Sequence, residues 1–280
     1  MDKLNASLRF LADTFVVATE ECDLTQPVCA PADVTDLFVL PNIFGQVNRT
    51  IILMFLAALV VTAILWFALR HPRVVPTKFQ AAVESLVGLI RDDVAIGVIG
   101  PEGLKYFPYL LSLFMFILVG NLFEVTPLVN FPITSRMAIP GFLSLATYFI
   151  FVIVGFAKNG FGYLTGVVWP RDVPVALRPL VGLIEFFSIF FIRPLSLAVR
   201  LFANLVAGHV MLSLLLVTGV VFIGAAFAGD ISILKGGAGL LWFAFGLVIY
   251  MFEILVSVIQ AYVFTLLSAV YIQSSVHAEH

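Results

Sequence analysis

The most restrictive feature of this sequence is an apolar segment, residues 180–228, that is more than twice as long as an ordinary membrane span. A helix needs about 20 residues to cross the hydrocarbon of a bilayer, at roughly 1.5 Å per residue. No loop-like break interrupts the segment, so it is either two spans with a buried turn or one long, strongly tilted helix. A second long apolar segment, residues 240–272, follows it. Two such helices in succession suggest elements that lie nearly flat against a partner in the membrane.

The composition places the chain among polytopic membrane proteins. Of its 280 residues, 61% are hydrophobic and 11% are charged, whereas soluble domains have about 25% charged residues. The net charge of -2 carries no information about nucleic-acid binding, but the sequence has no basic cluster, and we expect no nucleic-acid partner. No Gly-rich phosphate loop, metal-ligand motif or Ser/His/Asp arrangement is recognisable. We therefore expect no catalytic residues, no cofactor and no metal site.

The hydrophobic pattern predicts an all-α polytopic membrane protein whose membrane domain covers residues 51–275. Residues 76–100 are expected to form an amphipathic surface helix, because charged residues interrupt apolar ones there at helical spacing. The remaining helices, about five in number, are expected to be embedded in the membrane. They are predicted at residues 51–69, 106–129, 142–156, 180–228 and 240–272.

Residues 1–50 form a mixed, acidic segment in front of the first expected span. Residues 8–18 could form a short amphipathic helix, and no clear signal peptide stands out. Both cysteines of the chain, Cys22 and Cys29, lie in this segment. They could close a small disulfide loop if the segment faces an oxidising compartment, or remain as two unpaired thiols.

Basic residues cluster in two of the connecting segments, and this bias predicts the orientation. Residues 70–105 and 158–179 carry most of them, whereas the opposite loops hold only Arg136 and Lys235. The positive-inside rule places residues 70–105 inside and the N-terminal segment outside. If residues 180–228 and residues 240–272 each cross the membrane once, the number of crossings is odd, and the short tail, residues 276–280, lies in the cytoplasm.

A permanent positive charge, Arg200, lies inside the longest apolar segment. A guanidinium stays protonated in proteins, and an Arg at the centre of a bilayer costs from roughly 3 to more than 10 kcal/mol, depending on the scale. Such a residue persists only beside a partner or a water-filled cavity, and it usually marks an ion pathway. The residues around Arg200 should therefore indicate what the chain does.

Several polar residues share one face of the helix that carries Arg200. At about 100° per residue, they fall within about 40° of Arg200, whereas His209 lies about 180° away. A narrow polar stripe with a small residue allows another helix to approach the guanidinium closely. The stripe comprises Arg193, Ser196, Arg200, Asn204 and Ala207.

Two further polar pairs lie in other predicted helices. Glu253 and Gln260 are seven residues apart and share a face of the last helix, and Asn121 and Glu124 share a face of the second span. A titratable Glu and His in one bilayer, separate from a fixed cation, are the parts of a proton relay. The arginine cannot relay a proton, but it can favour the charged form of a nearby carboxylate.

Most of these residues also have a purely structural interpretation. Arg193 precedes Pro194 and could pair with Glu185 across a kink. His209 could be a satisfied core histidine, and Glu253 could hold two helices together. Only Arg200 is difficult to explain by structure alone, because its charge is permanent.

The chain resembles subunit a of the F-type ATP synthase at these residues. The segment RPLSLAVRLFANLVAGHVML, residues 193–212, is similar to the family's fourth transmembrane core motif. The segment YMFEILVSVIQAYVFTLLSAVYI, residues 250–272, resembles its last helix, and NLFEVTP, residues 121–127, resembles a third stretch. The likeness covers about residues 40–275.

The resemblance implies a proton-translocating stator subunit with no catalytic site of its own. In that family, two long helices lie nearly horizontal beside a rotating ring of c subunits, and two aqueous half-channels lead protons to and from a ring carboxylate. Arg200 matches the arginine that separates the half-channels, and Asn204 and Gln260 match polar residues near it. His209 and Glu253 match the inlet pair, with acid and imidazole exchanged relative to some members.

The role of Glu124 is less secure, because many members have no carboxylate at its position. Asn121, Arg193 and Ser196 are possible channel-lining residues. The implied partners are the c-subunit ring, b-type peripheral stalk subunits, the other ATP synthase subunits and the lipid bilayer. The acidic N-terminal segment favours a bacterial plasma membrane over a mitochondrial inner membrane, and the His/Glu pair favours H⁺ over Na⁺.

An ion-coupled secondary transporter is the alternative function, since it would also bury charges near the midplane. Such a protein should show internal repeats and helices interrupted by Gly or Pro in both halves. No repeat is recognisable in this sequence. A voltage sensor would need an arginine at every third position, whereas Arg193 and Arg200 are seven residues apart.

Overall fold

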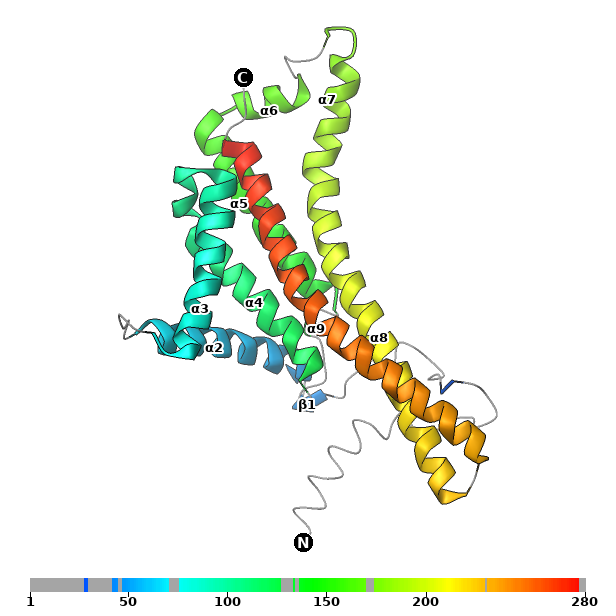
Figure 1. Cartoon of the computed structure of the whole chain (residues 1–280). Coiled ribbons are helices and arrows are strands. Elements are labelled where there is room, and N and C mark those ends of the chain that lie inside the picture. The colour runs from blue at the N-terminus through cyan, green and yellow to red at the C-terminus, as the bar shows by residue number, and fades with distance from the viewer. Residues whose placement is uncertain are drawn as a thin grey trace. The chain divides into compact units, whose positions relative to one another are not determined.

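The computed structural model describes residues 28–29, 42–44, 47–70, 76–126, 133, 136–169, 174–229 and 231–276 (Figure 1). Within these residues the chain is almost wholly helical, and five helices are long and apolar enough to cross a membrane. The predicted all-α polytopic class is therefore confirmed. The helix expected at residues 8–18 lies outside the described residues.

The membrane helices are α2, α4, α5, the continuous run from α7 through η5 to α8, and α9. A short antiparallel pair of strands, β1 (Asn42–Phe44) and β2 (Val47–Asn48), precedes the first of them. The helix bounds are α2 (Arg49–Leu69), α4 (Phe107–Val125), α5 (Ala138–Asn159), α7 (Arg178–Phe187), η5 (Ser188–Ile192), α8 (Arg193–Ala228) and α9 (Ile233–Val276).

The two long apolar segments each form one long helix. Arg178–Ala228 is helical over 51 residues without a loop, which excludes two spans with a buried turn. The π-helical turn η5 inserts an extra residue into the helix without breaking it. The 44 residues of α9 would measure about 66 Å at 1.5 Å per residue, about twice the roughly 30 Å of hydrocarbon. A straight helix of that length must tilt to stay within the bilayer.

Several helix ends differ from the predicted ones. α5 begins at Ala138 rather than at 142, because Pro140 lies in its first turn, where proline is tolerated. α9 begins at Ile233 rather than at 240, and Gly236 and Gly239 near its start pack against α8. α4 ends at Val125 rather than at 129. A short helix, α6 (Gly162–Val168), lies within residues 158–179, for which the sequence predicted only a connecting segment.

The surface helix comprises α3 (Lys78–Gly88) and the π-helical η2 (Leu89–Ile99), followed by the short η3 (Pro101–Lys105). Thr77 caps the N-terminus of α3, since its hydroxyl accepts a hydrogen bond of 3.3 Å from the Gln80 backbone N–H. Val83 and Ile90 are buried, whereas Arg91 is exposed. The run is thus amphipathic and is not among the five spans.

The chain divides into two compact units. Four membrane helices, α2, α4, α8 and α9, contribute residues to both of them. The first unit comprises Met1–Ile52, Leu122–Pro132 and Asn204–Ser257. The second comprises Leu53–Asn121, Ile133–Ala203 and Val258–His280.

In the first unit, the C-terminal part of α8 and the N-terminal part of α9 form a tightly packed antiparallel hairpin (Figure 1). A Cβ atom at Gly219 would lie 2.7 Å from Phe243 Cβ, and one at Gly239 would lie 2.7 Å from Phe222 Cβ. Glycine at these positions therefore allows the two helices to approach closely.

The segment before α2 also contacts α8 within the first unit. The backbone N–H of Cys29 donates a hydrogen bond of 3.0 Å to Thr218 Oγ1, and both residues are buried. Cys29 takes part in a disulfide. Cys22, the only other cysteine of the sequence, lies outside the described residues.

The second unit has an aromatic and aliphatic core, with Phe114, Phe151 and Phe264 fully buried. Hydroxyl groups join its helices within this core. Tyr109 Oη lies 2.7 Å from Thr147 Oγ1, which in turn lies 3.4 Å from Ser268 Oγ. Such interhelical hydrogen bonds help to hold helices together where no water competes for them.

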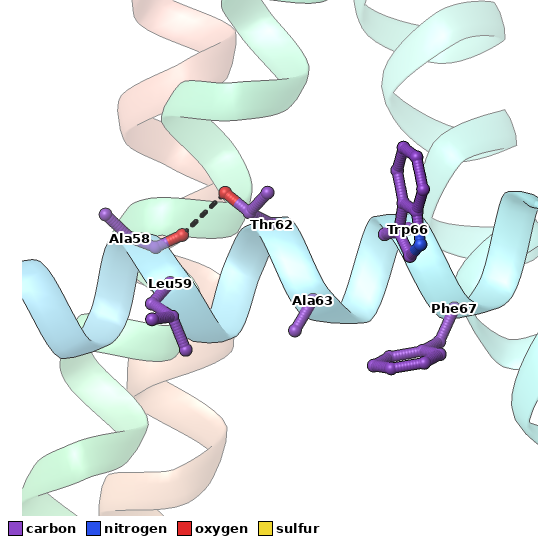
Figure 2. A pocket seen from close by; sticks show the side chains of 6 residues that line it. All are labelled: Ala58, Leu59, Thr62, Ala63, Trp66 and Phe67. Atoms are coloured by element: carbon purple, nitrogen blue, oxygen red, sulfur yellow. Dashed lines mark hydrogen bonds between the residues drawn. The ribbon is translucent and has the colours of Figure 1, made fainter.

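A shallow groove runs along one face of α2 in the second unit (Figure 2). The Thr62 hydroxyl donates a hydrogen bond of 2.8 Å to the Ala58 carbonyl, so it is satisfied within the helix. Trp66 and Phe67 are largely exposed, as expected for side chains that face lipid. The groove is lined by Ala58, Leu59, Thr62, Ala63, Trp66 and Phe67, and none of the predicted site residues belongs to it.

Candidate functional site

Three titratable side chains from three helices meet in the first unit. Glu124 comes from the end of α4, His209 from α8 and Glu253 from α9. All three are buried. His209 Nδ1 lies 3.7 Å from Glu124 Oε1, which is close enough for a charge interaction but beyond ordinary hydrogen-bond length.

The Glu253 carboxyl group lies against the backbone of α8 beside His209. A Cβ atom at Gly208 would lie 2.5 Å from the Glu253 carboxyl carbon, so only glycine leaves room for the carboxyl group there. Glu253 is also near enough to Glu124 for the two carboxyl groups to interact electrostatically. The helices therefore bring two acids and one imidazole into one cluster.

The carboxyl groups of this cluster are poorly satisfied by the protein. Three carboxyl oxygens have no hydrogen-bond partner among the described residues: both oxygens of Glu124, and Oε1 of Glu253. A buried polar group without a partner costs about 1–3 kcal/mol, and more if it is charged. Such exceptions call for an explanation, and an ionisable residue within a membrane span usually marks a functional site.

Tyr250 and Gly208 were not predicted as site residues. The Tyr250 hydroxyl donates a hydrogen bond to the Val125 carbonyl, and so ties α9 to the end of α4 next to Glu124. Tyr250 precedes Glu253 by three residues, which places both on one side of α9. That spacing is visible in the sequence, whereas the contact of Gly208 with Glu253 depends on tertiary packing.

Arg200 is exposed, although it lies within a membrane helix. It forms no ion pair within the part of the chain that the structure describes. Along the same side of α8, Ala203, Ala207 and Met211 are also exposed. Asn204 is half-buried, and its side-chain amide nitrogen has no hydrogen-bond partner among the described residues. Arg200 thus lies on an open strip of small and flexible side chains.

Arg193 lies on α8 two turns before Arg200, but its guanidinium is engaged. It donates a hydrogen bond of 3.1 Å from Nη1 to Ser274 Oγ and lies 5.3 Å from the centre of the Tyr271 ring. The alternative that Arg193 pairs with Glu185 is therefore wrong. Its partners are on α9, and the helix continues through Pro194.

The remaining predicted site residues are Ser196, Asn121 and Gln260, whose side chains carry no charge. The Ser196 hydroxyl donates to the Arg193 carbonyl within its own helix, at 3.0 Å. Asn121 and Gln260 are buried. The side-chain nitrogen of Gln260 has no hydrogen-bond partner in the described chain, so this amide is available to another group.

The chain matches the family described as ATP synthase A chain over residues 51–273. Similar proteins include the ATP synthase subunit a of Frankia alni, which is 37% identical over 83% of this chain and 79% of its own length. The subunit a of Dinoroseobacter shibae is 36% identical, and that of Paracoccus denitrificans is 37% identical, each over 88% of this chain and 94% of its own length.

The chain belongs to the ATP synthase subunit a family. This assignment confirms the resemblance that the segments at residues 193–212, 250–272 and 121–127 indicated. It makes the chain a multi-pass subunit of the proton-translocating membrane sector, which works with other ATP synthase subunits. The family assignment also argues against the alternative function, an ion-coupled secondary transporter.

Proposed function

We propose that this subunit a passes protons through two half-channels to and from a rotating ring of c subunits, and that Arg200 separates the half-channels. The observation that supports this most is the exposed guanidinium of Arg200 in a membrane helix, without an ion-pair partner in the described chain. An unpaired cation in the bilayer is too costly to be left facing lipid. A carboxylate on a neighbouring subunit provides the missing partner.

Arg200 acts on that carboxylate through its fixed charge. A nearby cation favours the ionised form of a carboxylate, so the ring carboxylate releases its proton as it passes Arg200. The same charge repels a proton that would cross directly from one half-channel to the other. Arg200 therefore couples proton release to rotation and also prevents a short circuit.

The cluster of Glu124, His209 and Glu253 forms the proton inlet. Its members are buried and close together, and they offer oxygen atoms that the described protein leaves without hydrogen bonds. Water that enters from the outside can bond these oxygens, and each carboxyl or imidazole group can accept a proton and pass it on. Glu124 contributes here as a third member beside the His209–Glu253 pair.

Other polar residues line the path near Arg200. Asn204 and Gln260 carry amides with free hydrogen-bonding capacity, which suits groups that contact a ring carboxylate or ordered water. Asn121 and Ser196 are further lining candidates. The partners are the c-subunit ring and b-type peripheral stalk subunits, and the membrane is a bacterial plasma membrane.

Cysteine cross-linking tests whether the Arg200 face of α8 meets the ring. Ala207 and Val220 are both exposed on α8, but they lie about 140° apart around the helix at 100° per residue. We expect Ala207→Cys to cross-link with a cysteine on the outer helix of the c subunit in the intact complex, and Val220→Cys not to do so. Labelling of the Ala207 position by a lipid-phase probe, without ring cross-links, would contradict the proposal.

Replacing Gly208 by alanine tests the geometry of the inlet. The new methyl group would displace the Glu253 carboxyl group, and a displacement of about 1 Å can cost about 10²-fold in rate. We expect Gly208→Ala to lower proton-driven ATP synthesis by at least about tenfold. Gly224→Ala is the matched control on α8, since a Cβ atom there meets nothing within 4 Å. Equal activities of the two variants would show that Glu253 need not occupy this position.

A further inference from the structure

The final turns of α9 are held by side chains from three other elements of the second unit. Arg193 of α8 bonds Ser274 and lies over the Tyr271 ring. From α5 and α6, Asn159 donates a hydrogen bond of 3.2 Å to the Ser275 carbonyl, and Tyr163 Oη lies 3.4 Å from Ser275 Oγ. This end of α9 is therefore anchored.

Arg193 is the charged member of this anchor, and its contacts restrict both position and rotation. A hydrogen bond to Ser274 restrains movement along the helix, and stacking over Tyr271 restrains rotation, since cation–π attraction requires the ring face. The Tyr271 ring also packs against Phe151 of α5, with centroids 6.0 Å apart. The beginning of α8 is also attached to α5, because the Ser144 hydroxyl of α5 donates a hydrogen bond to the Pro194 carbonyl.

We propose that Arg193 is a positioning residue that fixes the alignment of α8 with the C-terminal end of α9, and thereby the place of Arg200 relative to Gln260. This inference rests on the proposed function of Arg200. Arg200 follows Arg193 on α8 by about 10 Å, and Gln260 precedes Tyr271 on α9 by about 16 Å, at 1.5 Å per residue. A slide or rotation of α9 would move Gln260 with it.

Arg193 performs this role through its contacts and not through its charge alone. Its planar guanidinium can donate a hydrogen bond and stack on a ring at once, whereas a lysine ammonium is a point charge on a flexible stem. The contacts that matter are therefore those to Tyr271 and Ser274. A variant that keeps the charge but loses the planar group should be intermediate between the parent and a neutral variant.

Spin-label distances in the intact ATP synthase test the alignment directly. Leu195 on α8 and Val270 on α9 are exposed and can carry labels after replacement by cysteine, in a parent chain with Cys22→Ser and Cys29→Ser. We expect one narrow distance distribution in the parent and a broadened or shifted one in Arg193→Gln. Arg91→Gln is the control, since Arg91 is exposed on the surface helix, and it should leave the distribution unchanged.

ATP synthesis by the same complexes separates positioning from a direct effect of charge. Arg193→Gln should lower synthesis by at least about threefold, within the range that misplacement of a reacting group can cost. Tyr271→Leu should lower ATP synthesis by a similar factor. The double variant with Arg193→Gln and Tyr271→Leu should synthesise ATP little more slowly than Tyr271→Leu alone. Tyr271→Phe, which keeps a ring for the guanidinium, should restore both synthesis and the narrow distribution.

Two results would overturn the inference. One is an unchanged distance distribution in Arg193→Gln, and the other is a full additional loss when Arg193→Gln is combined with Tyr271→Leu. If the complex with Arg193→Gln fails to assemble, the distance distributions of Tyr271→Leu and Tyr271→Phe are compared instead. Equal distributions in these two variants would overturn the inference. Because the distances do not depend on proton transport, they test Arg193 even if the proposed role of Arg200 fails.

Discussion

Arg200→Ala is expected to abolish proton-driven ATP synthesis in a complex that still assembles. Without the fixed cation, no group favours the ionised form of the ring carboxylate as it passes, so proton release is no longer driven. The guanidinium is exposed and makes no ion pair in the described chain, and its removal therefore breaks no such contact within the subunit. The measurement is ATP synthesis in vesicles energised by a proton gradient.

Arg200→Lys provides the finer comparison for this prediction. Lysine keeps a charge but lacks the planar, multi-donor group and can lose its proton, so synthesis should fail here as well. Arg91→Gln removes a cation from the surface helix, where its pair with Asp92 is exposed and 3.9 Å long, and should leave synthesis intact. Normal synthesis in Arg200→Ala would overturn the mechanism.

Glu253→Gln is expected to cause the second-largest loss of proton-driven ATP synthesis, after Arg200→Ala. Glutamine fills nearly the same space beside Gly208 but cannot hold and release a proton. A positioned proton-transfer group contributes about 10²–10⁴-fold to a rate, so we expect proton-driven ATP synthesis to fall by at least about tenfold. Assembly, measured by recovery of the complete complex, should be unchanged. Full activity would remove Glu253 from the proton path.

Exchanging the two inlet groups provides the rescue for this prediction. The double variant His209→Glu with Glu253→His keeps one acid and one imidazole in the cluster. It should recover part of the synthesis that Glu253→Gln loses, since both groups can still take and give a proton. Recovery no better than in Glu253→Gln would indicate that the arrangement of the groups, and not only their chemistry, is required.

The helical architecture could be predicted from hydrophobic length and periodicity. The uninterrupted apolar segment at residues 180–228 is expected to be helical in a bilayer, because a helix forms all its backbone hydrogen bonds within the segment. The exposed strip with Arg200 and Ala207 also follows from spacing around one helix. Helix ends were less predictable, since Pro140 and the glycines at 236, 237 and 239 are residue types that often mark loops.

The inlet cluster could be predicted only in part. Periodicity shows which residues share a face of one helix, but not which faces of different helices meet. The closeness of Glu124 to His209 depends on how α4 packs against α8, and the contact of Glu253 with Gly208 depends on the approach of α9. The anchoring of Arg193 by Tyr271 was missed for the same reason, because the nearer Glu185 was the more obvious partner in the sequence.

Passive proton flux through the membrane sector tests the separating role of Arg200 most directly. The vesicles would carry the membrane sector without the catalytic head, with either the parent chain, Arg200→Ala or Arg200→Lys. A unit charge about 4 Å from a crossing proton contributes about 4 kcal/mol at an effective dielectric constant of about 20, so the flux in Arg200→Ala should rise by at least about tenfold. Arg200→Lys should leak less than Arg200→Ala. An assembled Arg200→Ala sector as proton-tight as the parent would contradict the account.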